Sequence, residues 1–126
     1  MIRYAYNRQM SPPAPFVHVT VGCSQTGMEI GDLPAQLDTA ADRTVVPLQI
    51  VSQLGLVPLD EVTVSDFGGQ ILLSPTYRVV LTVRNSQRQI VEVIAYPDES
   101  MVLLGRDVLN QFRIMLDGPG LALELA

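Results

Sequence analysis

Short runs of alternating apolar and polar residues occupy most of this chain, and turn residues separate them. The run 16–21 is rich in β-branched side chains and stops at Gly22, which is typical of a β-strand. Turn-forming residues at 67–69, 84–87 and 117–120 divide the later runs into hairpins. Those runs predict strands at 35–38, 62–66, 70–83, 89–96, 102–104, 113–116 and 121–125. The pattern therefore predicts an all-β fold that is mostly antiparallel.

Two short segments depart from this pattern and predict helices. Residues 47–54 start with Pro47, which suits the first turn of a helix, and they end before Gly55, which suits a C-terminal cap. Residues 106–112 follow Gly105 in the same way. Neither segment is long enough to organise a helical bundle, so the helices are expected to be accessories of the β structure.

The first fourteen residues are expected to behave differently from the rest. Pro12 and Pro13 have no N–H to donate, so the segment around them cannot pair as a regular strand. Residues 1–14 therefore predict an N-terminal arm or leader, and residues 15–126 predict one domain.

Composition narrows the possible partners. The chain has 126 residues, a net charge of −5 and eight Lys and Arg residues, which argues against a nucleic acid partner. The single cysteine allows no disulfide within the chain and no cysteine-rich metal site. The first ten residues lack the apolar run of a signal peptide, and no stretch approaches the length of a membrane span. We expect a cytoplasmic protein with no membrane partner and no cofactor.

The segment 35–45 is the part of the sequence that carries chemistry. Asp38 comes directly after a short apolar strand, and the small residues that follow it would let another chain approach closely. Such a carboxylate could activate a water molecule. It could equally cap the next turn, which is a common role for an Asp at the end of a strand. The local pattern leaves both interpretations open.

A resemblance to a known family favours the first interpretation. The segment Leu37-Asp38-Thr39-Ala40-Ala41-Asp42 resembles the active-site motif of retroviral-type aspartic peptidases, an apolar residue followed by Asp-Thr/Ser-Gly-Ala-Asp. Residues 103–109, Leu-Leu-Gly-Arg-Asp-Val-Leu, resemble the second signature of that family. Residues 66–70 are similar to the glycine-rich tip of its flap, a β-hairpin that closes over bound peptide. The resemblance covers residues 15–126 and implies a retropepsin-like β-barrel with a flap and one or two short helices.

The resemblance also implies an assembly. Hydrolysis by this chemistry needs two carboxylates, one acting as a base on water and the other as an acid toward the carbonyl oxygen. Asp38 supplies one of them, and the sequence contains no second copy of the motif. A C2 homodimer would provide the other, and two carboxyls about 3 Å apart would share one proton, as is general for aspartic peptidases. The expected activity is endopeptidase cleavage of a peptide or protein substrate.

The roles of individual residues follow from the same resemblance. Asp38 is the expected catalytic residue, Thr39 would hydrogen-bond across the twofold axis, and Ala40 would support the dyad beside it. Arg106 would form a structural salt bridge with Asp42. The residues expected to contact substrate are Ala41, Asp42, Val45, Phe67, Gly68 and Leu103, of which Val45 and Leu103 could equally be core. The final strand, 121–125, resembles the dimerisation strand of the family or simply closes the sheet.

One residue departs from the family pattern. Ala40 stands where the family usually has Gly, and a glycine could serve a positive φ or the close approach of another backbone. The alternative function is therefore a dimer of the same fold that binds peptide but cleaves it slowly or not at all. An adaptor module in which Asp38 only caps a turn is a further possibility. Cys23 and His18 could in principle form a nucleophile and base pair, but no residue that would orient them is evident nearby. Both are expected to be structural.

Overall fold

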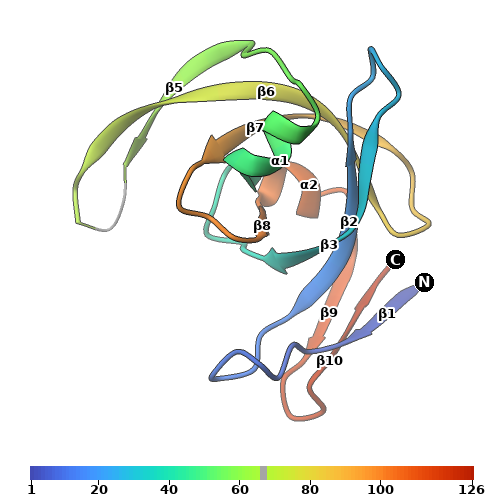
Figure 1. Ribbon diagram of the computed structural model, residues 1–126. Helices are drawn as coiled ribbons and strands as arrows, with labels where there is room; N and C mark the ends of the chain where they lie inside the picture. The colour runs from blue at the N-terminus through green and yellow to red at the C-terminus, as the bar shows by residue number, and fades with distance from the viewer. Residues whose placement is uncertain (66–67) are drawn as a thin grey trace.

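The computed structural model describes residues 1–65 and 68–126, in which the main feature is a closed β-barrel (Figure 1). Six strands are hydrogen-bonded in the order β2-β3-β8-β4-β7-β6, and a further pairing between β6 and β2 closes the ring. The bounds of these strands are β2 Phe16–Gly22, β3 Glu29–Leu37, β8 Val102–Leu104, β4 Val45–Pro47, β7 Gln89–Tyr96 and β6 Ile71–Val83. The predicted all-β barrel is confirmed.

Alternation of apolar residues explains the barrel. Val17, Val19 and Val21 of β2 have exposed fractions of 1% or less, whereas His18 between them is exposed. The same inward-facing pattern recurs on β6 and β7, and these side chains form one continuous core. Burial of this stripe is what selects the register of each strand, because a slip of one residue would expose the whole set.

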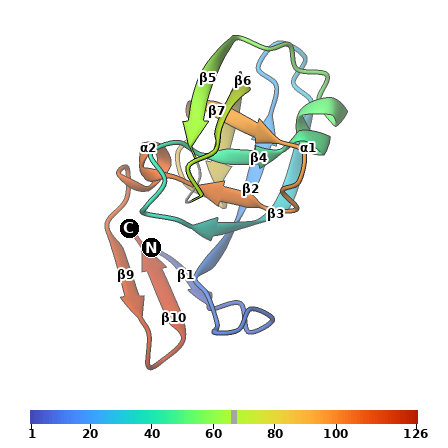
Figure 2. The same cartoon turned by 90° about the vertical axis from the view of Figure 1, so that its left-hand side faces the viewer.

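A hairpin and a second sheet extend from the barrel. Strand β5 (Asp60–Ser65) pairs with the first half of β6, and the hairpin they form projects beyond the ring (Figures 1 and 2). The second sheet has the order β1-β10-β9, with β1 at Ile2–Ala5, β10 at Ala122–Leu125 and β9 at Ile114–Asp117. Leu123 and Leu125 of β10 are buried against the core.

The N-terminal segment takes part in this second sheet. Strand β1 lies within residues 1–14, where we expected an arm or leader, and it pairs with β10 over all four of its residues. Tyr4 fixes it to the barrel, because its ring lies 5.7 Å from that of His18 and 5.0 Å from the guanidinium carbon of Arg84. The proline-containing part of the segment forms only an isolated bridge, between Asn7 and Ala14.

Both predicted helices are present, and they are short. Helix α1 spans Leu48–Gln53, with Pro47 as its N-terminal cap and Gly55 after it at a φ of 63°. Helix α2 spans Arg106–Leu109. It ends earlier than predicted because the N–H groups of Gln111 and Phe112 bond to carbonyls three residues back, which tightens the chain into a turn. Among the described residues, no helix is long and apolar enough to cross a membrane.

Strand β3 shows where the alternation pattern misled the prediction. It begins at Glu29 rather than at residue 35. It contains Gly31, Pro34 and Asp32, the last with a φ of 57°, and its register against β2 shifts between Val19 and Val21. Such an irregular strand has no clean two-residue period to detect. The short strand β4 was also missed, and two of the barrel pairings, β3–β8 and β4–β7, are parallel.

Candidate active site

Asp38 lies at the end of β3, in a loop whose two ends are both attached to β8. Leu37 is paired with Leu104, and the N–H of Asp38 donates to the carbonyl oxygen of Leu104 at 2.9 Å. At the other end of the loop, Val45 is paired with Leu103. Strand β8 therefore runs between β3 and β4 and holds the segment 38–44 in place.

The loop is further fixed by bonds to its own backbone and to α2. The N–H of Ala41 donates to the carbonyl oxygen of Asp38 at 3.2 Å, and the N–H of Ala40 donates to Oδ1 of Asp38 at 3.2 Å. Arg106 contributes twice, because its N–H donates to the carbonyl oxygen of Ala41 at 2.9 Å and its Nη1 to that of Thr39 at 2.8 Å. These bonds set the direction of the half-buried Asp38 carboxylate.

A buried polar network lies directly behind the loop. The hydroxyl of Thr44 donates to Oδ1 of Asp107 at 2.7 Å and accepts the N–H of Gly105 at 3.1 Å. The N–H of Thr44 donates to Oδ2 of the same carboxylate at 3.0 Å. Thr44 has no exposed surface and Gly105 is buried, so the hydroxyl of Thr44 and the N–H of Gly105 depend on this network for their hydrogen bonds. Sequence reasoning placed Asp107 in the second signature but assigned no role to it or to Thr44.

Gly105 makes the close contact between the two signature segments possible. A Cβ built on it would lie 2.5 Å from the carbonyl carbon of Arg43 and 2.9 Å from the nitrogen of Thr44. Any side chain at this position would push the loop away from α2. The glycine of the second signature is thus explained by the approach of the loop backbone.

Comparison with known proteins identifies the architecture. No family model matches the sequence, and no curated protein matches it either. A retropepsin-like aspartic protease from Rickettsia conorii superposes with a TM-score of 0.70 at 15% identity, covering 98% of this chain and 88% of that one. The EIAV protease complexed with the inhibitor HBY-793 superposes with a TM-score of 0.60 at 18% identity, covering 86% and 93%. The chain has the retropepsin-like fold.

A third structure widens the range of this fold. The retroviral protease-like domain of Ddi1 from Leishmania major superposes with a TM-score of 0.51 at 15% identity, covering 87% of each chain. At these identities the likeness concerns the fold alone. The three superpositions support the retropepsin-like barrel that the sequence resemblance implied.

Five of the predicted site residues lie together in the structure, and the others lie elsewhere. Asp38 to Asp42 lie together in one loop, in which Thr39, Ala40 and Asp42 are exposed and Ala41 is half-buried. Val45, with 8% of its surface exposed, belongs to the core side of β4, while Leu103 is half-buried. Gly68 is exposed at the end of the β5–β6 hairpin, and Phe67, like Asp66, lies outside the described residues.

Arg106 has a different partner from the one predicted. Within the described residues the ion pairs are Arg43–Glu92 at 3.1 Å and Arg3–Glu124 at 3.5 Å, so Asp42 and Arg106 are not paired. Arg106 instead donates to the Thr39 carbonyl oxygen. A single chain therefore uses Arg106 to hold the backbone of the loop and leaves the exposed Asp42 carboxylate without an ion pair.

Ala40 is not strained by its backbone conformation. Non-glycine residues with positive φ in the described chain are Asp32, Arg84 and Leu121, and Ala40 is not one of them. The reason considered for a glycine at this position, a positive φ, therefore does not apply. What remains is the Ala40 methyl group, which is exposed in the single chain.

A groove adjoins the hairpin and was not found from the sequence. It has a volume of about 320 Å³ and lies between the β5–β6 hairpin and the end of β7. Val64 and Leu72 are directly opposite each other in the hairpin and therefore share a face. The groove is lined by residues including Val64, Leu72, Tyr96, Pro97, Asp98 and Glu99. Pro97, Asp98 and Glu99 follow β7 in a turn, and their sequence contains no recognisable motif.

The remaining chemical candidates lie apart from the loop. His18 is exposed on β2 and contacts Tyr4, and Cys23 is buried at the end of the same strand. The hydroxyl of Thr26, which hydrogen-bonds to the thiol, lowers the pKa of Cys23. The part of the chain that the structure describes contains no group of three His, Cys, Asp or Glu residues able to hold a metal ion.

Proposed function

We propose that this protein is an aspartic endopeptidase that acts as a homodimer, with Asp38 of each subunit forming the catalytic dyad. The observation that carries the proposal is the loop 38–44. It is fixed by β8 and α2 on its inner side, and it presents one half-buried carboxylate with exposed neighbours on the other. The retropepsin-like fold adds support, since two of the superposed structures are proteases.

The chemistry needs one ionised and one protonated carboxyl. The ionised carboxylate accepts a proton from water as the water oxygen bonds to the peptide carbonyl carbon, and the protonated one donates to the carbonyl oxygen. The resulting tetrahedral intermediate breaks its C–N bond as the leaving nitrogen takes a proton. Because one proton must be shared between the two Asp38 side chains, activity should fall when the pH leaves either side of a bell-shaped optimum.

The other predicted residues have roles around this dyad. No described residue hydrogen-bonds to the Thr39 hydroxyl, so it is available to bond across the twofold axis. The backbone of Ala41 and Asp42 would bind the substrate main chain, and Leu103 would line a pocket next to it. The β5–β6 hairpin, with Phe67 and Gly68 at its tip, would cover the bound peptide as a flap.

Cleavage of a peptide library between pH 4 and 7 tests the proposal. The natural chain should cleave, and Asp38→Asn should not, because an amide can neither accept the water proton nor share a proton with its partner. Asp42→Asn is the matched control, with the same change of charge and size four residues further on; it should remain folded and keep measurable activity. Equal activity of the natural chain and Asp38→Asn would disprove the assignment.

Ala40 favours a second candidate, a peptide-binding dimer with weak or no turnover. Its exposed methyl group lies two residues from Asp38, where a partner backbone or a substrate would approach. If the methyl obstructs catalysis, Ala40→Gly should gain turnover at unchanged fold. A transition-state mimic of the statine type distinguishes the two functions from an adaptor role, because its binding should depend on Asp38. An adaptor that uses Asp38 only as a cap would not bind it.

A further inference from the structure

Strand β7 has a neighbour on only one side along its first half. It pairs with β6 over residues 89–94, but β4 pairs only with its last three residues, 94–96. The ladder with β4 stops at Thr44, because the Thr44 N–H that would continue it to the carbonyl oxygen of Glu92 donates to Oδ2 of Asp107 instead. Within the part of the chain that the structure describes, residues 89–93 therefore form an open sheet edge in the barrel wall.

The alternation along β7 identifies the backbone groups on this edge. The N–H of Ile94 donates to the carbonyl oxygen of Thr44 at 3.0 Å, so residue 94 directs its backbone groups away from β6. Glu92 and Ile90 direct theirs the same way, because every second residue of a strand does so. No described residue hydrogen-bonds to these N–H and C=O groups. Two donors and two acceptors therefore point outward from the edge.

A groove of about 720 Å³ runs along this edge. Four consecutive residues of β7, 89–92, line it, whereas the face of a strand would contribute every second residue. The opposite wall includes Asp107 of α2 and, from the turn after it, Gln111 and Phe112. The backbone edge of β7 therefore forms one wall of a groove.

The outer face of the edge is apolar at its centre. Ile90 exposes 74% of its surface, and its register partner on β6 is the half-buried Val80. No described residue continues this row on the other side of Ile90. A strand added at the edge would place its own side chain there, and an apolar one would cover Ile90.

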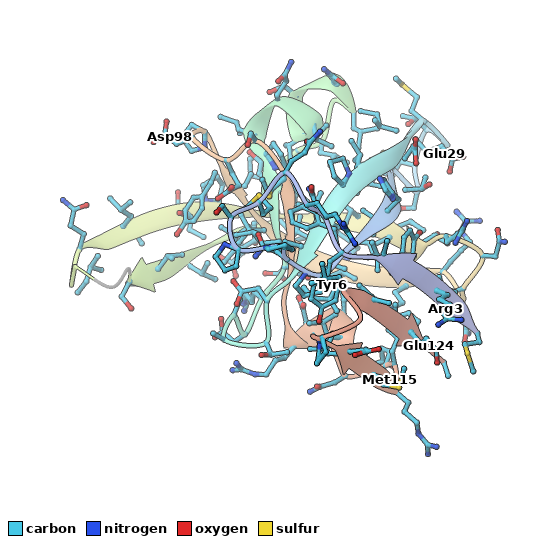
Figure 3. The ribbon with its side chains drawn as sticks, turned by 90° about the horizontal axis from the view of Figure 1, so that it is seen from below. Arg3, Tyr6, Glu29, Asp98, Met115 and Glu124 are labelled. Carbon is cyan, nitrogen blue, oxygen red and sulfur yellow. The ribbon has the colours of Figure 1, made fainter. Side chains whose placement is uncertain are left out.

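A cation without an ion pair lies beside Ile90. Arg88, two residues earlier in the chain, lines the groove and is exposed. The ion pairs of the described residues are Arg43–Glu92, at the other end of the groove, and Arg3–Glu124, which Figure 3 shows side by side in the second sheet. Arg88 belongs to neither pair, so it is free to meet a carboxylate of a ligand.

We propose that this edge binds an extended peptide segment of a partner protein, which adds to β7 as an antiparallel strand. Antiparallel pairing is the more stable of the two directions. One peptide residue would exchange both backbone hydrogen bonds with Ile90, and the residue two positions before it would do the same with Glu92. The residue opposite Ile90 would be apolar, and the residue two positions after it would be acidic, to meet Arg88. The site does not use Asp38, so it is independent of the proposed peptidase activity.

Hydrogen exchange of single amides tests the pairing directly. The probe is acetyl-Thr-Thr-Thr-Val-Thr-Glu-Thr-amide, with its valine for Ile90 and its glutamate for Arg88. The amides of Ile90 and Glu92 should exchange rapidly in the free protein, and saturating probe should slow both at least about tenfold. Val91 and Val93 direct their N–H groups toward β6, so their exchange should not change. They are the controls within the same strand.

Changes to the probe test its direction and its backbone. The reversed sequence, acetyl-Thr-Glu-Thr-Val-Thr-Thr-Thr-amide, should bind about fivefold more weakly, because antiparallel pairing carries its glutamate away from Arg88. N-methylation of the valine blocks a hydrogen bond to Ile90 and should weaken binding at least about tenfold. N-methylation of the threonine after it is the matched control, since that N–H faces away from β7. Fluorescence anisotropy of labelled probes measures each affinity.

Changes to the protein provide the complementary test. Arg88→Glu should weaken binding of the probe about tenfold, because it places like charges opposite each other. A probe with arginine in place of its glutamate should then recover most of the affinity. Ile90→Pro removes an N–H that the described chain does not use, so it should keep the fold and lose the binding. Ile90→Val is its control, because it keeps both the N–H and an apolar side chain.

The outcomes separate this inference from the proposed function. Equal protection of Ile90 and Glu92 in Asp38→Asn and in the natural chain supports the site, whether or not the chain cleaves peptides. Displacement of the probe by the statine-type mimic assigns the probe to the cleft at Asp38 and overturns the inference. Tighter binding of the reversed sequence, or no binding up to about 1 mM probe, overturns it as well.

Discussion

The loop 38–44 and the β5–β6 hairpin belong to the same proposed cleft, and they are built in opposite ways. The loop is held by β8, α2 and the network around Thr44, which has no exposed surface. The hairpin is held by its own ladder, and three consecutive residues at its far end, Ile71, Leu72 and Leu73, are 69%, 54% and 71% exposed. The loop, one wall of the cleft, has its supporting contacts within a single chain. The hairpin, the other wall, exposes apolar surface that only a ligand or partner could cover.

The two walls of the cleft are therefore expected to differ in how rigid they must be. A catalytic group must be held in a fixed geometry, and the loop meets this need before any substrate arrives. A hairpin that closes over a peptide must break contacts when it opens, so such segments belong to the less stable parts of a fold. Stability should therefore respond to changes in the loop, and substrate affinity to changes in the hairpin.

The largest effect on stability is expected from Gly105→Ala. The new Cβ would meet the Arg43 carbonyl group and the Thr44 nitrogen, all backbone atoms that cannot swing away. We expect a loss of at least about 3 kcal/mol in the free energy of unfolding, measured by urea denaturation. Gly118→Ala is the control, because its Cβ would have no atom within 4 Å, and it should unfold like the natural chain. Equal stability of the two variants would contradict the close approach.

The next largest effect is expected from Thr44→Val. The change keeps the shape of the side chain, but it removes one hydrogen bond to the Asp107 carboxylate and leaves the buried Gly105 N–H without its acceptor. We expect a loss of about 2 kcal/mol in the free energy of unfolding. Thr63→Val makes the same chemical change on the exposed hairpin and should stay within about 0.5 kcal/mol. If both variants lost the same stability, the two walls would not differ as described.

The smallest expected effect on stability, and a clear one on affinity, comes from Leu72→Ala. Leu72 lines the groove next to Tyr96, whereas Leu73 points to the other face of the hairpin. If the groove binds substrate, Leu72→Ala should raise KM about fivefold with little change in stability. Leu73→Ala should leave KM unchanged. An equal rise in KM for both would show that the hairpin acts through its flexibility and not through the groove.

The sequence predicted those parts of the molecule that depend on local pattern. The strands β2, β6 and β7 were visible because their residues alternate, and Asp38 was visible because its neighbours resemble a motif. The resemblance also implied that residues 37 and 104 belong to one site, and their pairing confirms that the two segments meet.

Features that depend on long-range contacts were missed or assigned differently. The Thr44–Asp107 network joins residues 63 positions apart, and neither residue type indicates such a partner by itself. Arg106 was expected to pair with a carboxylate, but the nearby Thr39 carbonyl oxygen takes its Nη1 donor instead. The strand β1 was missed because it has only four residues, too few for an alternation pattern to be recognised, and two prolines follow it.

The position of β8 between β3 and β4 has a consequence for how the protein is made. The segment with Asp38 is translated before the strand that fixes it, Val102–Leu104. Contacts of such large sequence separation form slowly, because the intervening chain must lose its freedom first. The nascent chain should therefore carry an unformed loop 38–44 until Val102–Leu104 has been synthesised, which would delay the proposed activity until after that point.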